Sequence, residues 1–288
     1  MTTPTTNPTV ESPQPPQDWM ANLSAWMRPT VSPEHGVYVV LLVSFVTGAA
    51  AAQHWTWATT FASICAICGF QAEHPLAIQI RQRKTWKPRL LLWGIVYGGI
   101  SSAIAFYLYW RTGDLFSPLL WIYLGAIAAL LFDGFSIWHR EQKSIINEIV
   151  TFAAVSLSAP FSYVVSTNHI STVAIGLWLL NALFFSSSIF TVKLRKLKKD
   201  ESLTPAIQRI VVYHLLATGI IIGLYAFDIL PQFTALSFGV VLIKVGLILW
   251  QQQWYCTTRI QSVAMLETLS ALLFFGLSAI SVLPNHLG

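Results

Sequence analysis

Long apolar stretches alternate with short polar ones along most of this 288-residue chain. There are nine such stretches, and a helix needs about 20 apolar residues to cross the hydrocarbon of a bilayer. The pattern therefore predicts an all-α bundle of about nine transmembrane helices. The predicted spans are residues 37–53, 55–80, 90–109, 116–138, 148–166, 170–192, 210–229, 232–250 and 262–283.

The first 30 residues do not follow this pattern. Residues 1–17 are rich in Thr, Pro and Gln, and such a segment buries too little apolar surface to become ordered. Residues 18–30 carry Trp19 and Trp26 seven positions apart, which suits an amphipathic helix in the membrane interface; a linker without fixed structure is the alternative. We expect a single transmembrane domain over residues 31–288.

Small residues predict where the helices approach each other most closely. The chain contains two Gly-x-x-x-Gly motifs, Gly94 with Gly98 and Gly219 with Gly223. A helix face without side chains lets another backbone come close. We therefore expect both motifs to lie at helix contacts.

The composition and the charge pattern both indicate a membrane protein. The chain is 55% hydrophobic and only 10% charged, compared with roughly 25% charged residues in soluble domains. All of the 17 basic residues except Arg111 and Lys244 lie on one side when the chain is threaded through the spans. The positive-inside rule then predicts a cytoplasmic N-terminus and a C-terminus on the opposite side, in a bacterial-type inner membrane or an internal membrane. Anionic lipid head groups are the expected partners of the basic loops, and we expect no nucleic-acid binding.

Ionisable residues inside the spans are costly, so each one suggests a purpose. Lys244 and Glu267 lie at similar distances from the tip of the last hairpin, which predicts that they pair. Asp133 and Glu148 are likewise equidistant from a turn near Arg140. The alternative is that such residues only fix the register of the helices.

A second group of polar residues suggests a site on the cytoplasmic side. Glu34 and His35 open the first span and are candidate proton-transfer groups, although an acid at this position also suits a helix cap. Arg140, Lys193 and Arg195 can hold an anionic group, and Asn147 lies near the same entrance. The alternative for the basic run at residues 193–199 is that it anchors the chain to lipid phosphates.

Motifs of known chemistry are missing from the sequence. It contains no phosphate-binding P-loop, no H-E-x-x-H and no G-x-S-x-G. It also lacks the D-x-x-x-D pattern that would hold Mg²⁺ on a diphosphate. We therefore predict no metal site, and the sequence indicates neither a cofactor nor an oligomeric state.

Several of these residues form a pattern that resembles a known family. Pro33-Glu34-His35-Gly36 is similar to the P-x-E-H-G-A-W signature of the YwiC-like membrane proteins, with Val37-Tyr38 in place of Ala-Trp. Arg140-Glu141, Asn147-Glu148, the Leu157-Ser158-Ala159-Pro160 segment, the basic end of span six and Glu267 also look like that family. The resemblance covers about residues 29–283 and implies a multi-pass membrane protein without an established activity.

A fainter, architectural similarity is to the UbiA-type prenyltransferases. They also have nine spans with polar residues gathered on the cytoplasmic side, but their two Asp-rich motifs are absent here. Three hypotheses follow. The first is an enzyme acting on a lipid or quinone-like substrate from the cytoplasmic side. The second is a proton-coupled or anion transporter, and the third is a non-catalytic membrane assembly subunit. The outer halves of the predicted spans carry few polar residues apart from Asp228 and Arg111 at the rim, which favours a one-sided site and thus the enzyme.

Overall fold

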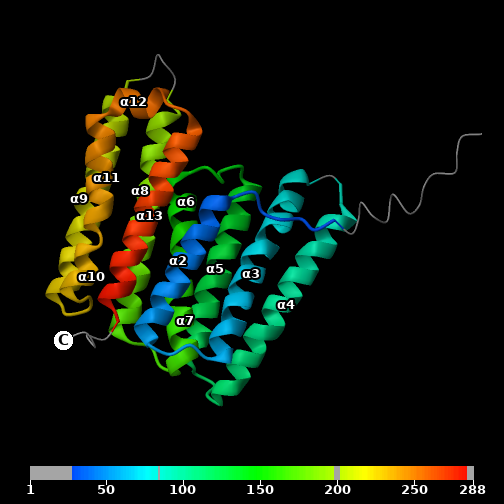
Figure 1. The fold of residues 1–288 in the computed structure, drawn as a ribbon. Coiled ribbons are helices and arrows are strands. Elements are labelled where there is room, and N and C mark those ends of the chain that lie inside the picture. The colour runs from blue at the N-terminus through cyan, green and yellow to red at the C-terminus, as the bar shows by residue number, and fades with distance from the viewer. Residues whose placement is uncertain (1–27, 84, 198–201, 284–288) are drawn as a thin grey trace, which may run out of the picture.

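The computed structural model describes residues 28–83, 85–197 and 202–283, and every regular element in this part of the chain is an α-helix (Figure 1). The helices of the first half are α2 (His35–Ala52), α3 (Trp57–Gln82), α4 (Pro88–Thr112), α5 (Pro118–Trp138), α6 (Ile145–Ser156) and α7 (Ser158–Thr167). Those of the second half are α8 (Thr172–Arg195), α9 (Thr204–Ala226), α10 (Gln232–Leu236), α11 (Gly239–Trp250), α12 (Gln252–Thr257) and α13 (Ile260–Ser281).

Nine spans among the described residues are long and apolar enough to cross a membrane, which confirms the predicted architecture. The pairs α6–α7 and α10–α11 each make one span that is interrupted within it. The interruption after α6 has a clear cause: Pro160 has no N–H to donate to the carbonyl of Ser156, and its ring crowds that carbonyl.

The structure differs from the predicted spans in two places. Helix α9 begins at Thr204, six residues before the predicted start at 210, because polar residues extend the helix beyond its apolar part and Pro205 suits the first turn. The tip of the last hairpin is a short helix, α12, where the pattern indicated only a turn. The arm at 1–17 and most of the segment at 18–30 lie outside the described residues.

Helix α2 lies in the middle of the bundle. It packs against α7, α8 and α13, while α3 packs against α4 and α5 on one side and α8 against α9 on the other. Two hydrophobic cores result: one joins α2 and α7 to α8, α9, α11 and α13, and a smaller one joins α2 and α7 to α3, α4 and α5. The side-by-side arrangement places α12, the α5–α6 turn and the end of α3 toward the same end of the bundle (Figure 1). We call it the basic end.

The closest approach between helices is that of α2 and α7. A Cβ atom on Gly48 would lie only 2.0 Å from the carbonyl oxygen of Ala159. Ser162 donates a hydrogen bond of 2.7 Å to the carbonyl of Phe45, and Ser158 donates one of 3.2 Å to Leu41. These contacts hold the two helices together where hydrocarbon offers no other polar partners.

The glycine prediction is confirmed for one motif only. A Cβ atom on Gly94 would lie 3.3 Å from Leu76 Cδ2, and one on Gly98 would lie 3.8 Å from Ala72, so this motif packs α4 against α3. Around Gly219 and Gly223, no atom of the described chain lies within 4 Å of such a Cβ position, and the prediction is wrong there. The motif lies on α9, a helix at the edge of the bundle, whose outer face meets no other helix of the described chain.

Candidate functional site

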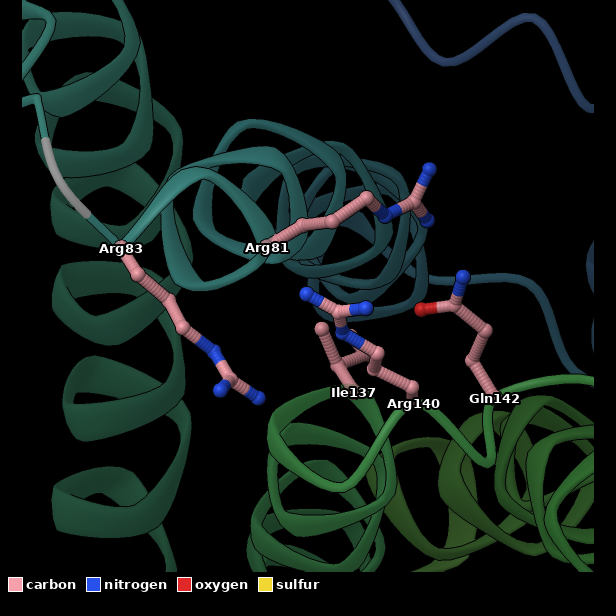
Figure 2. A pocket seen from close by; sticks show the side chains of 5 residues that line it. All are labelled: Arg81, Arg83, Ile137, Arg140 and Gln142. Carbon is pink, nitrogen blue, oxygen red and sulfur yellow. The ribbon is translucent and has the colours of Figure 1, made fainter.

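A pocket of about 280 Å³ opens at the basic end, between the end of α3 and the α5–α6 turn. Figure 2 shows Arg81 in the last turn of α3 and Arg83 just after it, with Ile137, Arg140 and Gln142 on the opposite side of the pocket. Three guanidinium groups thus line one concave surface, and none of its lining residues is acidic. We call these five residues the arginine pocket.

Two of the three arginines stand on unusual backbone. Arg83 ends α3 with a φ of 46°, and Arg140 follows α5 with a φ of 64°. The Arg140 turn closes with hydrogen bonds from Arg140 N to Ile137 O (3.1 Å) and from Glu141 N to Ser136 O (2.8 Å). Glycine is the usual residue in this C-terminal motif, because a side chain on left-handed backbone costs about 1 kcal/mol.

This placement has a structural explanation and a functional one. Cations near helix C-termini are stabilised by the helix dipole, which would account for Arg81 in the last turn of α3. The helix dipole does not explain why Arg83 and Arg140 have a positive φ, a backbone conformation that glycine adopts more easily, where both line the same pocket. Strained backbone of this kind gathers at functional sites, so the two arginines are candidates for binding a ligand through their side chains.

A tryptophan beside the pocket indicates its depth relative to a bilayer. The guanidinium of Arg83 sits over the ring of Trp138, 4.7 Å from its centroid, in a cation–π contact. Trp138 ends α5 and is 56% exposed. Tryptophan at the end of a span marks the depth of the lipid head groups. A ligand in the pocket can therefore keep its apolar part in the bilayer.

A buried amide connects the pocket to a carboxylate below it. Asn147 on α6 is 3% exposed, and its Nδ2 donates to Asp133 Oδ1 (2.8 Å) and to the carbonyl of Gln142 (3.2 Å). Its Oδ1, like Oε1 of Gln142, is buried without a hydrogen-bond partner in the described chain. Asn147 thus holds Asp133 in place and also contacts Gln142, which lines the pocket.

Asp133 belongs to a loose group of carboxylates. Glu73 on α3 lies within electrostatic reach of Asp133, Glu34 and Arg81, and its own carboxyl is partly buried. Glu73 is not among the site residues predicted from the sequence. The signal that would have found it is its position, since an ionisable residue within a span asks for a reason.

Glu34 and His35 lie exposed at the start of α2. Glu34 occupies the N-cap position, but its side chain makes no capping hydrogen bond. The segment is held instead by Ser32, whose N–H donates to Gln71 Oε1 on α3 (3.0 Å). A capping hydrogen bond therefore does not explain Glu34, which lies within electrostatic reach of Glu73.

The other predicted anion-binding residues lie apart from the arginine pocket. Lys193 on α8 pairs with Glu148 on α6 at 2.9 Å and also donates to the carbonyl of Lys143. Arg195 donates to the carbonyl of Tyr255 (2.7 Å) and to that of Thr258. Both cations thus bind protein groups and tie α8 to its neighbours.

The two predicted intramembrane pairs have different outcomes in the structure. Lys244 Nζ lies 2.9 Å from Glu267 Oε2, so these residues pair across α11 and α13. Asp133 and Glu148 do not come together: Asp133 binds Asn147, and Glu148 binds Lys193. Within the described ranges, no three His, Cys, Asp or Glu residues are grouped so that they could hold a metal ion.

Comparison with known proteins supports the resemblance seen in the sequence. The model of the family described as YwiC-like protein matches residues 31–163, and no curated protein matches the chain. The matching segment contains the arginine pocket, Asn147 and the carboxylates, whereas Lys193, Arg195, Lys244 and Glu267 lie outside it. Residues 31–163, the part of the chain that builds this site, are thus similar to the YwiC-like family.

Proposed function

We propose that this multi-pass membrane protein is an enzyme that binds the anionic head of a lipid or quinone-like substrate in the arginine pocket. The observation that carries the proposal is the convergence of Arg81, Arg83 and Arg140 on one pocket from two separate elements. Guanidinium groups match phosphate and carboxylate oxygens in pairs. The opening beside Trp138 suits a substrate whose tail remains in the bilayer.

The carboxylates next to the pocket are the proposed proton-transfer groups. Asp133 is oriented by Asn147, and a positioned carboxyl can give or take a proton at a bound substrate. Glu34 and Glu73 face the same region. His35 directly follows Glu34 and is exposed, so it can exchange protons with water near neutral pH.

The distribution of charge favours an enzyme over a carrier. At the end of the bundle opposite the pocket, the acidic and basic residues of the described chain are Arg111, Asp114 and Asp228, and all three are exposed at or beyond the helix ends. A carrier needs polar groups that continue through the membrane. The basic end is cytoplasmic if the predicted orientation holds.

Binding can be tested with dodecyl phosphate, which combines an anionic head with an apolar tail. With the full chain in nanodiscs of zwitterionic lipid, we expect Arg81→Gln and Arg140→Gln each to weaken binding of dodecyl phosphate about tenfold, the loss of one charge-assisted hydrogen bond. The matched control is Arg111→Gln, at the opposite end, which should bind the probe like the wild type. Equal binding by all three variants would reject the pocket as an anion site.

The chemical step is tested separately in cells. A strain lacking the protein should accumulate an amphipathic anion in untargeted lipid and metabolite profiling, and the wild-type chain should restore the profile. Asp133→Asn should fail to restore it while its dissociation constant for dodecyl phosphate stays unchanged. Full restoration by Asp133→Asn would show that this carboxylate performs no catalytic step.

A further inference from the structure

The second half of the bundle contains a polar centre that the proposed function does not use. The ion pair between Lys244 and Glu267 lies within the larger hydrophobic core. The side chain of Lys244 is 3% exposed and that of Glu267 is 24% exposed, on a helix that crosses the membrane. The lysine is therefore enclosed by protein, while the glutamate side chain is partly exposed.

Two oxygen atoms of this centre lack a partner. Glu267 uses Oε2 for Lys244, but its Oε1 is buried and accepts no hydrogen bond from any described residue. The hydroxyl of Tyr255 on α12 is also buried without a partner, on a residue that is 0% exposed. The Thr191 side chain lies close to this hydroxyl and itself donates to the carbonyl of Ser188. A buried polar group left unpaired costs about 1–3 kcal/mol.

The two unpaired oxygen atoms belong to one neighbourhood. The Glu267 carboxylate is close enough to act electrostatically on the Tyr255 hydroxyl. Burial raises the pKa of Tyr255, so its hydroxyl keeps its proton at neutral pH. The centre thus offers a strong acceptor and a hydroxyl near each other.

The surroundings close this centre above and below. Arg195 holds α12 in place through the carbonyls of Tyr255 and Thr258. On the other side, Phe184 lies 5.7 Å from Lys244 Nζ and stacks on Phe274, with ring centroids 3.8 Å apart. The partly exposed Glu267 is therefore the side of the centre that a polar group can approach.

The remaining titratable neighbour is already satisfied. His214 on α9 lies within electrostatic reach of Lys244. Its Nε2 lies 2.8 Å from Ser187 Oγ, and its Nδ1 lies 2.7 Å from the carbonyl of Ile210. A carbonyl only accepts, so Nδ1 carries the proton and Nε2 accepts from Ser187. Both ring nitrogens are occupied, and His214 has nothing left to offer a ligand.

We propose that this centre binds the hydroxyl head of an amphipathic alcohol or phenol. One O–H group can donate to Glu267 Oε1 and at the same time accept from the Tyr255 hydroxyl, which satisfies both unpaired atoms. An anionic head would meet the Glu267 carboxylate, and a cationic head would meet Lys244 and Arg195. A neutral hydroxyl avoids both repulsions, and the side-chain exposure of Glu267 lets it arrive from the bilayer.

The test uses dodecanol and the variant Tyr255→Phe, which removes only the unpaired hydroxyl. In nanodiscs, we expect Tyr255→Phe to bind dodecanol about tenfold more weakly and to lose most of the rise in unfolding temperature that dodecanol causes. Its affinity for dodecyl phosphate should not change. The matched control is Tyr213→Phe, which also loses one hydroxyl of this half, but one that donates to the carbonyl of Leu183; its dodecanol binding should equal that of the wild type.

Two results would overturn the proposal. If a water molecule is all that occupies the centre, the wild type and Tyr255→Phe bind dodecanol equally, and the proposal is overturned. Glu267→Gln provides a second measurement, because an amide oxygen is a weaker acceptor than a carboxylate; unchanged dodecanol binding by this variant also overturns it. The dodecyl phosphate arm keeps this test separate from that of the arginine pocket.

Discussion

Arg140 illustrates how a single residue can be placed against its own conformational preference. It stands on left-handed backbone at the end of α5, with its guanidinium in the arginine pocket. Selection for stability alone favours glycine at such a position. The proposed anion site offers an explanation: the arginine is kept for what its side chain binds.

This explanation predicts that Arg140→Gly separates stability from binding. Removing the side chain relieves the backbone, so we expect the free energy of unfolding to rise by about 1 kcal/mol, while dodecyl phosphate binds about tenfold more weakly. Thermal unfolding and binding in nanodiscs measure the two effects. Asn168→Gly is the control, because Asn168 has a φ of 58° at the end of α7 and lies outside the pocket. Weaker stability and intact binding in Arg140→Gly would contradict the explanation.

The sequence pointed to some residues of the site and missed others. Arg140, Asn147, Asp133 and Glu34 were singled out because of their positions near the spans. Arg81 and Arg83 were counted only as cytoplasmic basic residues, since charge bias does not show which cations share a pocket. Their convergence depends on how α3 ends relative to the α5–α6 turn.

The same limit applies to the residues that were expected to bind an anion and have other contacts. A run of basic residues has the same appearance in a sequence whether its members face water, lipid or a backbone carbonyl. Arg195 binds two carbonyls next to α12, and α12 itself was not predicted because its six residues carry no periodic pattern. Short helices of this kind are decided by tertiary contacts.

At the scale of elements, the spans were predictable because crossing a bilayer demands length and apolarity. Depth along a hairpin was also informative, since Lys244 and Glu267 lie within hydrogen-bond distance. Equal depth did not bring Asp133 and Glu148 together, because each found a nearer polar partner. Depth limits which residues can meet, and the rotation of each helix decides which of them do.

The tight contact between α2 and α7 yields a prediction at this scale. Gly48→Ala would place a Cβ atom against the carbonyl oxygen of Ala159, so the helices must separate, and we expect a loss of about 1–3 kcal/mol. Thermal unfolding in detergent measures it. The matched control, Gly219→Ala on α9, meets open space and should leave stability unchanged or slightly higher. Equal effects of the two substitutions would show that α2 and α7 are not closely packed.

At the scale of the whole molecule, the orientation in the membrane is a prediction of the positive-inside rule. The rule predicts that the α5–α6 turn faces the cytoplasm and the α4–α5 turn faces the opposite side. We expect a membrane-impermeant maleimide, added to spheroplasts, to label Leu115→Cys and to leave Lys143→Cys unlabelled, in a background with Cys65, Cys68 and Cys256 replaced by Ser. Labelling of both sites after lysis is the control. The reverse pattern in intact spheroplasts would invert the orientation and place the arginine pocket outside.

The cation–π contact between Arg83 and Trp138 has a consequence for the cell that surrounds this protein. A recess at that depth is always in the presence of resident phospholipids, whose phosphates are chemically similar to any anionic substrate. If the arginine pocket binds an anionic substrate as proposed, phospholipids of the same bilayer compete with that substrate for the pocket. A bilayer enriched in acidic lipids would then slow turnover of the substrate without any change in the protein. The composition of the host membrane would thereby act as a standing inhibitor.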